Sequence, residues 1–158
     1  MKKYPNSIFK GLSLLYIALL TYIVLGAEWR WKYDIIEIRK VLNVVPLYNK
    51  IEVWPPWDPF SKHSTEFYLD LVGNIVLFIP FPFFLFFIFQ VLSFRTQLVL
   101  TIITSLFIEI NQYYWGIGVT DIDDLILNTL GGFIGANLLQ ALLNNKVFRT
   151  YAYSHLRH

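Results

Sequence analysis

Long runs of apolar residues, bounded by polar or charged stretches, dominate the chain. Four of these runs approach or reach the roughly 20 residues that an α-helix needs to cross a bilayer, and they cover residues 11–27, 71–92, 98–115 and 125–143. A longer, more mixed stretch separates the first run from the second and spans residues 28–70. The pattern predicts an all-α fold, in which about four transmembrane helices form an integral membrane bundle within one domain, residues 1–158.

The first apolar run has an alternative interpretation, because three lysines precede it, as they would precede a secretory signal peptide. The run is long for the apolar region of a signal peptide, and the small-residue cleavage pattern after Leu25 is poor. We therefore expect an uncleaved transmembrane helix.

Composition supports a membrane protein and excludes several kinds of site. Charged residues make up only 15% of the chain and hydrophobic residues 56%, whereas soluble domains carry about 25% charged residues. The net charge of +2 is small, and the basic residues lie near helix ends, so we expect no nucleic-acid partner. The chain has no cysteine, which excludes disulfides and thiolate metal ligands.

The basic residues predict the orientation in the membrane, since Lys and Arg concentrate on the inner side. They occur at the N-terminus, in the short link between the second and third runs, and in the C-terminal tail. The link between the third and fourth runs instead carries three Asp and neither Lys nor Arg. We expect a multi-pass protein with both termini inside. The long loop over residues 28–70 then lies outside, because long loops are translocated largely regardless of charge.

Polar and small residues form a stripe along the fourth run. If the helix begins near Asp121, one face carries Asp121, Asp124, Asn128, Gly131 and Gly135. The glycines, together with Gly132, would let another helix approach closely. A purely structural interpretation is also open, in which the Asp residues cap the helix N-terminus and the glycines form a packing seam.

The third run carries a second polar face, because Ser105, Glu109 and Gln112 recur at helical spacing. An ionisable side chain at the centre of a membrane helix costs about 2.5–3.5 kcal/mol on insertion scales, so Glu109 must face protein or water. In the second run, Asn74 lies at a similar depth. The sequence F-I-P-F-P, which follows Asn74, removes two backbone donors and is expected to kink that helix.

In this topology seven candidate site residues converge on the outer half of the membrane: Asn74, Glu109, Gln112, Asp121, Asp123, Asp124 and Asn128. Their oxygens and amides suit the amide, hydroxyl or ammonium groups of a lipid-linked sugar-peptide. They also suit a divalent cation such as Mg²⁺ or Ca²⁺, with Glu109, Asp121 and Asp124 as candidate metal ligands, although we expect no cofactor. No nucleophile–base pair is apparent, because the three histidines lie in the long loop and the tail.

Together these motifs resemble the VanZ-like family of bacterial membrane proteins. The family pattern has an Asn and a Pro in the first loop, then N-x-x-x-F-x-P, S-x-x-x-E-x-x-Q and D-x-D-D-x-x-x-N-T-x-G-x-x-x-G. The matching residues are Asn43, Pro46, Asn74, Phe78, Pro80, Ser105, Glu109, Gln112, Asp121, Asp123, Asp124, Asn128, Thr129, Gly131 and Gly135. The chain departs from the pattern at Pro82, where the family usually has Gly, and over residues 115–120, which lack an Arg that many members carry.

The resemblance implies a cell-envelope protein of the bacterial plasma membrane. The family is named after a protein that confers low-level resistance to the glycopeptide antibiotic teicoplanin, which carries a lipid tail and acts beside the bilayer. The expected function is non-enzymatic binding or shielding at the outer membrane face. The expected partners are membrane lipid and either the glycopeptide or a lipid-linked cell-wall precursor.

Two alternative functions stay open. The oxygen-rich acids would suit a metal-dependent membrane enzyme that acts on a lipid-linked cell-wall precursor. The proline-broken second run and the buried acid would suit a small transporter subunit, which would require a homo-oligomer because four spans are few for a monomer.

Overall fold

The computed structural model describes residues 7–26, 43–46, 62–117 and 120–153. Helix α1 (Ser7–Thr21) continues into a short π-helix, η1 (Tyr22–Gly26). The later helices are α4 (Lys62–Phe78), α5 (Phe81–Phe89), α6 (Phe94–Trp115), α7 (Ile122–Asn144) and α8 (Lys146–Ala152). The described residues contain no strand and only one isolated parallel bridge, between Asn43 and Asp121. The prediction of an all-α membrane bundle is therefore confirmed.

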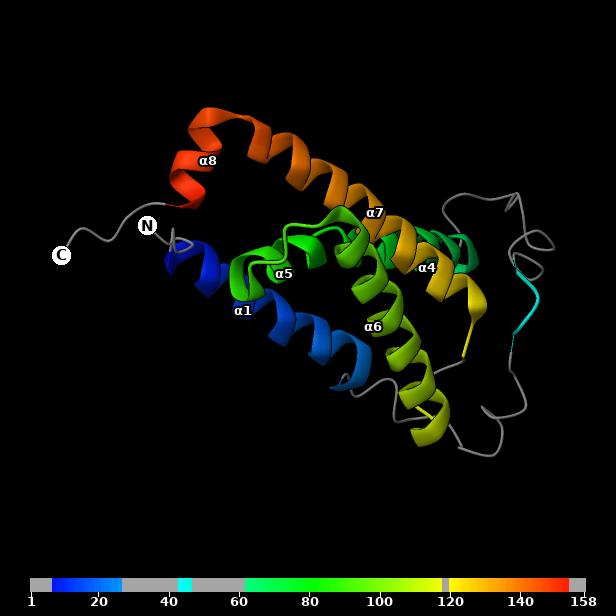
Figure 1. Ribbon diagram of the computed structural model, residues 1–158. Helices are drawn as coiled ribbons and strands as arrows, with labels where there is room; N and C mark the ends of the chain where they lie inside the picture. The colour runs from blue at the N-terminus through cyan, green and yellow to red at the C-terminus, as the bar shows by residue number, and fades with distance from the viewer. Residues whose placement is uncertain (1–6, 27–42, 47–61, 118–119, 154–158) are drawn as a thin grey trace.

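Helix α7 is central to the bundle, because it packs against both α6 and α4 and also meets α5 (Figure 1). On another side of the bundle α1 packs against α5. The start of α1 and the short helix α8 lie at the same end, where the rings of Phe9 and Phe148 are 6.0 Å apart. Most of the predicted loop over residues 28–70 lies outside the described residues, but α4 already begins at Lys62, so the loop ends earlier than predicted.

Within the part of the chain that the structure describes, three helical stretches are long and apolar enough to cross a membrane: Ser7–Leu25, Phe67–Phe89 and Ile122–Asn144. They correspond to the first, second and fourth predicted spans. The third, α6, has 22 residues and is long enough, but its polar side chains lower its mean hydropathy, and it is not among the three. The count of four spans stays a prediction.

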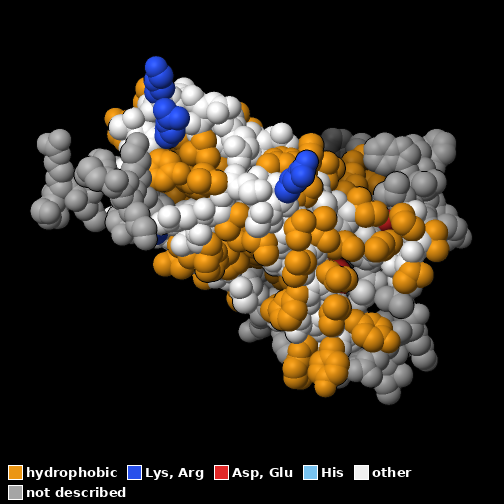
Figure 2. Space-filling view, viewed as in Figure 1, with side chains coloured by type: hydrophobic (Ala, Val, Ile, Leu, Met, Phe, Trp, Pro, Cys, Tyr) orange, Lys and Arg blue, Asp and Glu red, His pale blue; other side chains and the backbone are white. Residues whose placement is uncertain are grey.

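The two faces of α6 are reversed compared with those of a helix on a soluble protein. Its buried face carries Gln97, Thr101, Ser105, Glu109 and Gln112. Its exposed face carries Val99, Ile103, Leu106, Phe107 and Ile110, and Figure 2 shows hydrophobic side chains over this side of the molecule. Exposing apolar area to water costs about 25 cal/mol per Å², whereas lipid tails are as apolar as these side chains. This arrangement supports a position of α6 within the bilayer.

The second predicted span is interrupted at its prolines. Pro80 is the N-cap of α5, and Pro82 lies buried in the first turn of that helix. The carbonyls in the last turn of α4 have no N–H donor within that helix, and the prolines that follow have no N–H to offer. The Tyr16 hydroxyl of α1 donates to the carbonyl oxygen of Leu77 at 3.0 Å and stabilises this last turn of α4. The kink expected from the sequence is therefore present as a break between α4 and α5.

Close contact between α7 and its neighbours depends on glycine. A Cβ at Gly131 would overlap the carbonyl oxygen of Ile75, and a Cβ at Gly135 would overlap that of Ile79. A Cβ at Gly132 would overlap a threonine side chain of α6. Helix α7 therefore lies between α4 and α6 at distances that leave no space for side chains at these positions.

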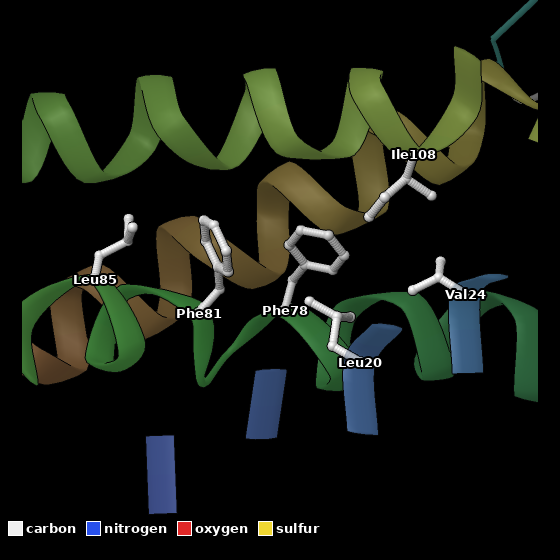
Figure 3. Close-up of a cluster of buried hydrophobic side chains, with 6 residues drawn as sticks. All are labelled: Leu20, Val24, Phe78, Phe81, Leu85 and Ile108. Atoms are coloured by element: carbon white, nitrogen blue, oxygen red, sulfur yellow. The ribbon is translucent and has the colours of Figure 1, made fainter. Parts of the chain in front are cut away.

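Two clusters of buried apolar side chains complete the packing. The first joins α1, η1, α4, α5 and α6 and is shown in Figure 3: Leu20, Val24, Phe78, Phe81, Leu85 and Ile108. The second lies around α8 and consists of Phe86, Phe87, Leu139, Leu143 and Ala152. The first cluster ends at Ile108, next to the polar residues of α6, so the polar site lies directly beside a packed apolar core.

Candidate functional site

One cavity of about 510 Å³ brings together polar residues from α4, α6 and α7. Its polar lining residues are Asp70, Asn74, Glu109, Gln112, Asp124 and Asn128. Its apolar lining residues come from η1, α4 and α6: Ile23, Val24, Leu69, Leu77 and Ile108. Five of the seven predicted site residues therefore line one space, which has a polar side and an apolar side.

A hydrogen bond between α4 and α7 forms one wall of the cavity. The Nδ2 of Asn74 donates to Oδ1 of Asp124 at 2.7 Å. The glycine contact at Gly131 lies beside Ile75, the residue next to Asn74, and fixes the spacing of the two helices there. The glycines of α7 allow α4 to approach closely. At this short distance the side chains of Asn74 and Asp124 can form a hydrogen bond.

A second polar pair joins α6 and α7 in a fully buried position. The Nδ2 of Asn128 donates to the hydroxyl oxygen of Ser105 at 2.9 Å. Asn128 is only 3% exposed, and its Oδ1 has no hydrogen-bond partner in the part of the chain that the structure describes. A buried amide oxygen normally accepts a hydrogen bond, because desolvation without one costs about 1–3 kcal/mol. The Asn128 oxygen is therefore a buried acceptor that no described residue uses.

Glu109 is 4% exposed and lies against the start of α7. Its Oε2 accepts from the backbone N–H of Asp121 at 3.1 Å, and its carbonyl oxygen accepts from the Thr120 hydroxyl at 3.4 Å. The first N–H groups of a helix have no partner within the helix, and the helix dipole favours negative charge there. A buried acid in α6 thus has a physical reason to lie beside the first turn of α7.

Asp121 caps α7 and also binds the first loop. Its Oδ1 accepts from the N–H of Asp123 at 2.8 Å, the usual geometry of an N-cap. The same oxygen accepts from Nδ2 of Asn43 at 2.8 Å. The backbone of Asn43 donates to the Thr120 carbonyl at 3.1 Å and accepts from the Ile122 N–H at 3.0 Å. Asn43 therefore attaches a loop residue to the start of the site helix.

Two of the seven predicted site residues do not line the cavity. Asp121 has the capping role that the structural interpretation gave to such an acid, and Asp123 is fully buried in the first turn of α7. Asn43 was absent from the predicted site, although it belongs to the motif that carries the resemblance. The only signal in the sequence is a single Asn within the apolar stretch V-L-N-V-V-P. This local pattern does not indicate that Asn43 pairs with Asp121.

Gln112 connects α6 to η1, since its Nε2 donates to the Val24 carbonyl oxygen at 3.3 Å. It is 3% exposed, so this bond lies inside the bundle. Of the predicted metal ligands, Glu109 and Asp121 meet through a backbone N–H, and Asp124 pairs with Asn74. Among the described residues no three His, Cys, Asp or Glu side chains form a group that could hold a metal ion.

Comparison with known proteins covers most of the chain and every lining residue of the cavity. The VanZ/LLP1 family model matches residues 12–144. The protein named Protein VanZ from Enterococcus faecium is 30% identical over 133 residues, which represent 82% of this chain and 71% of that protein. No solved structure matches.

Proposed function

The chain belongs to the VanZ/LLP1 family, and on that premise we propose that it lowers the susceptibility of a bacterial cell to teicoplanin. The proposed activity is binding of the lipid-tailed glycopeptide, or shielding of its lipid-linked target, at the outer face of the plasma membrane. The observation that carries the proposal is the 510 Å³ cavity, in which acids and amides face apolar side chains. Such a space suits a molecule that has a polar head and a hydrocarbon tail.

The distribution of charge supports an outer position for this cavity. The described basic side chains belong to the first turn of α1, the first turn of α6, and α8: Lys10, Arg95, Lys146 and Arg149. Figure 2 shows basic side chains around α8 and at the start of α6, whereas the acids lie toward the other end of the molecule. If Lys and Arg mark the inner side, both termini are inside and the cavity opens near the outer leaflet.

The apolar residues of the cavity allow a lipid tail to lie in it, although they do not prefer that tail to the surrounding lipid. Leu69, Leu77 and Ile23 lie in the same lining as Glu109 and Asp124. A hydrocarbon chain gains about 0.8 kcal/mol for each buried CH₂ when it leaves water, but nothing comparable when it leaves lipid. The tail therefore holds the drug at the membrane, and the polar side of the cavity supplies the specific contacts.

The arrangement of the acids favours binding over the metal-dependent enzyme. A two-metal mechanism needs several carboxylates directed at one point, whereas Glu109 and Asp124 are engaged with different parts of α7 and α4. The transporter alternative draws support from the broken second span, and a homo-oligomer would be needed for it. Binding requires only the cavity of a single chain.

The test is antibiotic susceptibility of a glycopeptide-sensitive Gram-positive host that expresses the protein. We expect the minimum inhibitory concentration to rise for teicoplanin but not for vancomycin, which separates an effect on the lipid tail from an effect on the shared target. The rise should be lost in Glu109→Gln and Asp124→Asn. It should persist in Gly11→Ala, because a Cβ at Gly11 meets no atom within 4 Å. Wild-type protein that reaches the membrane and changes neither value would refute the proposal.

A further inference from the structure

We infer that a groove between α1, α5 and α8 holds one acyl chain of an anionic phospholipid, whose phosphate lies at the basic end of the groove. This groove shares no lining residue with the cavity between α4, α6 and α7, so the inference goes beyond the proposed function and can fail without it. Three observations carry it: the apolar lining of the groove, its position along α1, and the charge at one of its ends.

The lining of the groove is almost entirely apolar and largely aromatic. It encloses about 210 Å³ and comes from α1, from α5 and its N-cap, and from α8. The ring of Phe9 stacks on Phe87 at a centroid distance of 4.7 Å and lies 6.0 Å from that of Phe148, so one side chain joins the three helices. Of the described lining residues only Ser13 and Tyr16 carry a polar group, and the Tyr16 hydroxyl already donates to the last turn of α4. The groove therefore offers a ligand mainly hydrocarbon contact.

The groove is large enough for part of a hydrocarbon chain. An apolar cavity of about 150 Å³ takes up benzene, so by the same ratio 210 Å³ accepts roughly eight carbons. Leu12 lines the groove and is 57% exposed, so the groove opens to the outside of the bundle. Within a bilayer this outside is lipid, and an acyl chain enters without leaving the membrane. Since the lining is no more apolar than lipid tails, any preference for one lipid has to come from the head group.

The position of the groove along α1 matches one leaflet. Its residues on this helix run from Phe9 to Tyr16, which is about 10 Å along the axis at 1.5 Å per residue. One leaflet contributes about half of the roughly 30 Å hydrocarbon core, so the groove covers much of its depth. A chain in the groove places its head group beyond Phe9, at the end of the bundle where α1 begins and α8 lies (Figure 1).

The charge at this end selects an anionic head group. Lys10 and Arg149 each directly follow a phenylalanine that lines the groove, and Figure 2 shows basic side chains around α8. None of the described residues of α1, α5 and α8 is Asp or Glu. Residues 1–27 and 125–158 each contain three Lys or Arg and no Asp or Glu. An anionic phosphate at this end therefore meets positive charge, and basic residues beside a membrane helix attract anionic lipids in this way.

The same charge argues against a second copy of this chain as the occupant. In a two-fold dimer through this face the same patch of each chain meets, so two basic ends would lie side by side and repel each other. A phospholipid brings the opposite charge and a hydrocarbon chain in one molecule. The surrounding bilayer supplies it at high concentration, so a modest preference is sufficient to keep the groove filled.

The test is a lipid titration of the full-length protein in mild detergent, followed by native mass spectrometry. Phosphatidylglycerol and phosphatidylcholine with identical acyl chains are compared, so that only the head group and its charge differ. We expect one phosphatidylglycerol per chain to bind about tenfold more tightly than phosphatidylcholine. Equal binding of the two lipids, or a dimer that binds neither, would overturn the inference.

Variants of the basic residues test the head-group contact. Lys10→Gln and Arg149→Gln should each weaken phosphatidylglycerol binding about fivefold and leave phosphatidylcholine binding unchanged. Arg95→Gln is the control, because Arg95 lies in the first turn of α6 and does not line the groove, although its removal changes the net charge equally. Equal loss in all three variants would mean a general effect of surface charge and would contradict the groove.

Variants that fill the groove test the acyl-chain contact. Ser13 lines the groove and is 6% exposed, so Ser13→Leu places a side chain where the acyl chain would lie. Leu12→Trp is the second such variant, because the exposure of Leu12 leaves room for the larger ring if Ser13→Leu does not fold. The control is Ala18→Leu, since Ala18 is exposed and lies on the opposite side of α1 from Phe9. We expect the preference for phosphatidylglycerol to fall in the groove variants and to persist in Ala18→Leu. An unchanged preference in the groove variants that fold would show binding by the head group alone and would overturn the inference.

Discussion

Single amide side chains make most of the polar connections between elements of this protein. The donors and acceptors are Asn43 and Asp121, Asn74 and Asp124, Asn128 and Ser105, Gln112 and the Val24 carbonyl, Gln97 and the Val91 carbonyl, and Gln140 and the Leu92 carbonyl. Inside a bilayer no water replaces a lost partner. Such bonds nevertheless stabilise membrane proteins by only about 0.6 kcal/mol on average, because the unfolded chain finds other partners. Their main effect is to fix which faces meet.

The Asn43–Asp121 bond should contribute more than this average, because its acceptor is a carboxylate. We expect Asn43→Ala to lower the free energy of unfolding by about 1–2 kcal/mol, measured as a lower midpoint of thermal unfolding in mild detergent. The matched control is Asn137→Ala, since Asn137 is exposed and bonds only to a carbonyl within its own helix. A midpoint that falls equally in both variants would show that the loop contact has no special weight.

At the scale of elements, the close approach of α7 to α4 is the feature most sensitive to substitution. A Cβ at Gly131 or Gly135 would meet backbone, which cannot move aside as a side chain can. Overpacking of this kind costs about 1–3 kcal/mol or more. Because Asn74 and Asp124 meet across the same helix pair, any separation of the helices also opens the site.

We therefore expect Gly135→Ala to destabilise the protein, while Gly11→Ala does not, since a Cβ there meets no atom within 4 Å. The midpoint of thermal unfolding in mild detergent measures the difference. An alanine at position 135 that is tolerated as well as one at position 11 would contradict the close approach of these helices.

The break between α4 and α5 has its own test. Tyr16→Phe removes the hydroxyl that donates to Leu77 and leaves the ring in place. The expected loss is about 0.5–1.5 kcal/mol of unfolding free energy, and Tyr22→Phe is the control because Tyr22 is 56% exposed. An unchanged midpoint for Tyr16→Phe would mean that the freed carbonyl needs no donor from α1.

At the scale of the whole molecule, hydropathy and helical spacing were sufficient to predict the class of fold and the polar faces of α6 and α7. They could not predict which faces meet. Asn74 pairs with Asp124 across 50 residues and Asn43 with Asp121 across 78, and no local pattern encodes such distances. The polar face of α6 shows the same limit. Helical spacing places Ser105, Glu109 and Gln112 on one face, but only the structure shows that α7 and η1 cover it.

The absence of cysteine from the sequence allows a direct test of the predicted topology. Single cysteines introduced at exposed positions near the ends of α6, Ser93→Cys and Trp115→Cys, should differ in their reaction with a membrane-impermeant maleimide added to intact cells. We expect labelling at Trp115 and at Val44→Cys, and none at Ser93 or Thr150→Cys until the cells are opened. This result would make α6 the fourth span, because its two ends would lie on opposite sides of the membrane.

Labelling of both ends of α6 from outside would mean that the helix does not cross the bilayer. Its polar face would then shield the cavity from the side, and the ligand would enter from the aqueous phase instead of the outer leaflet.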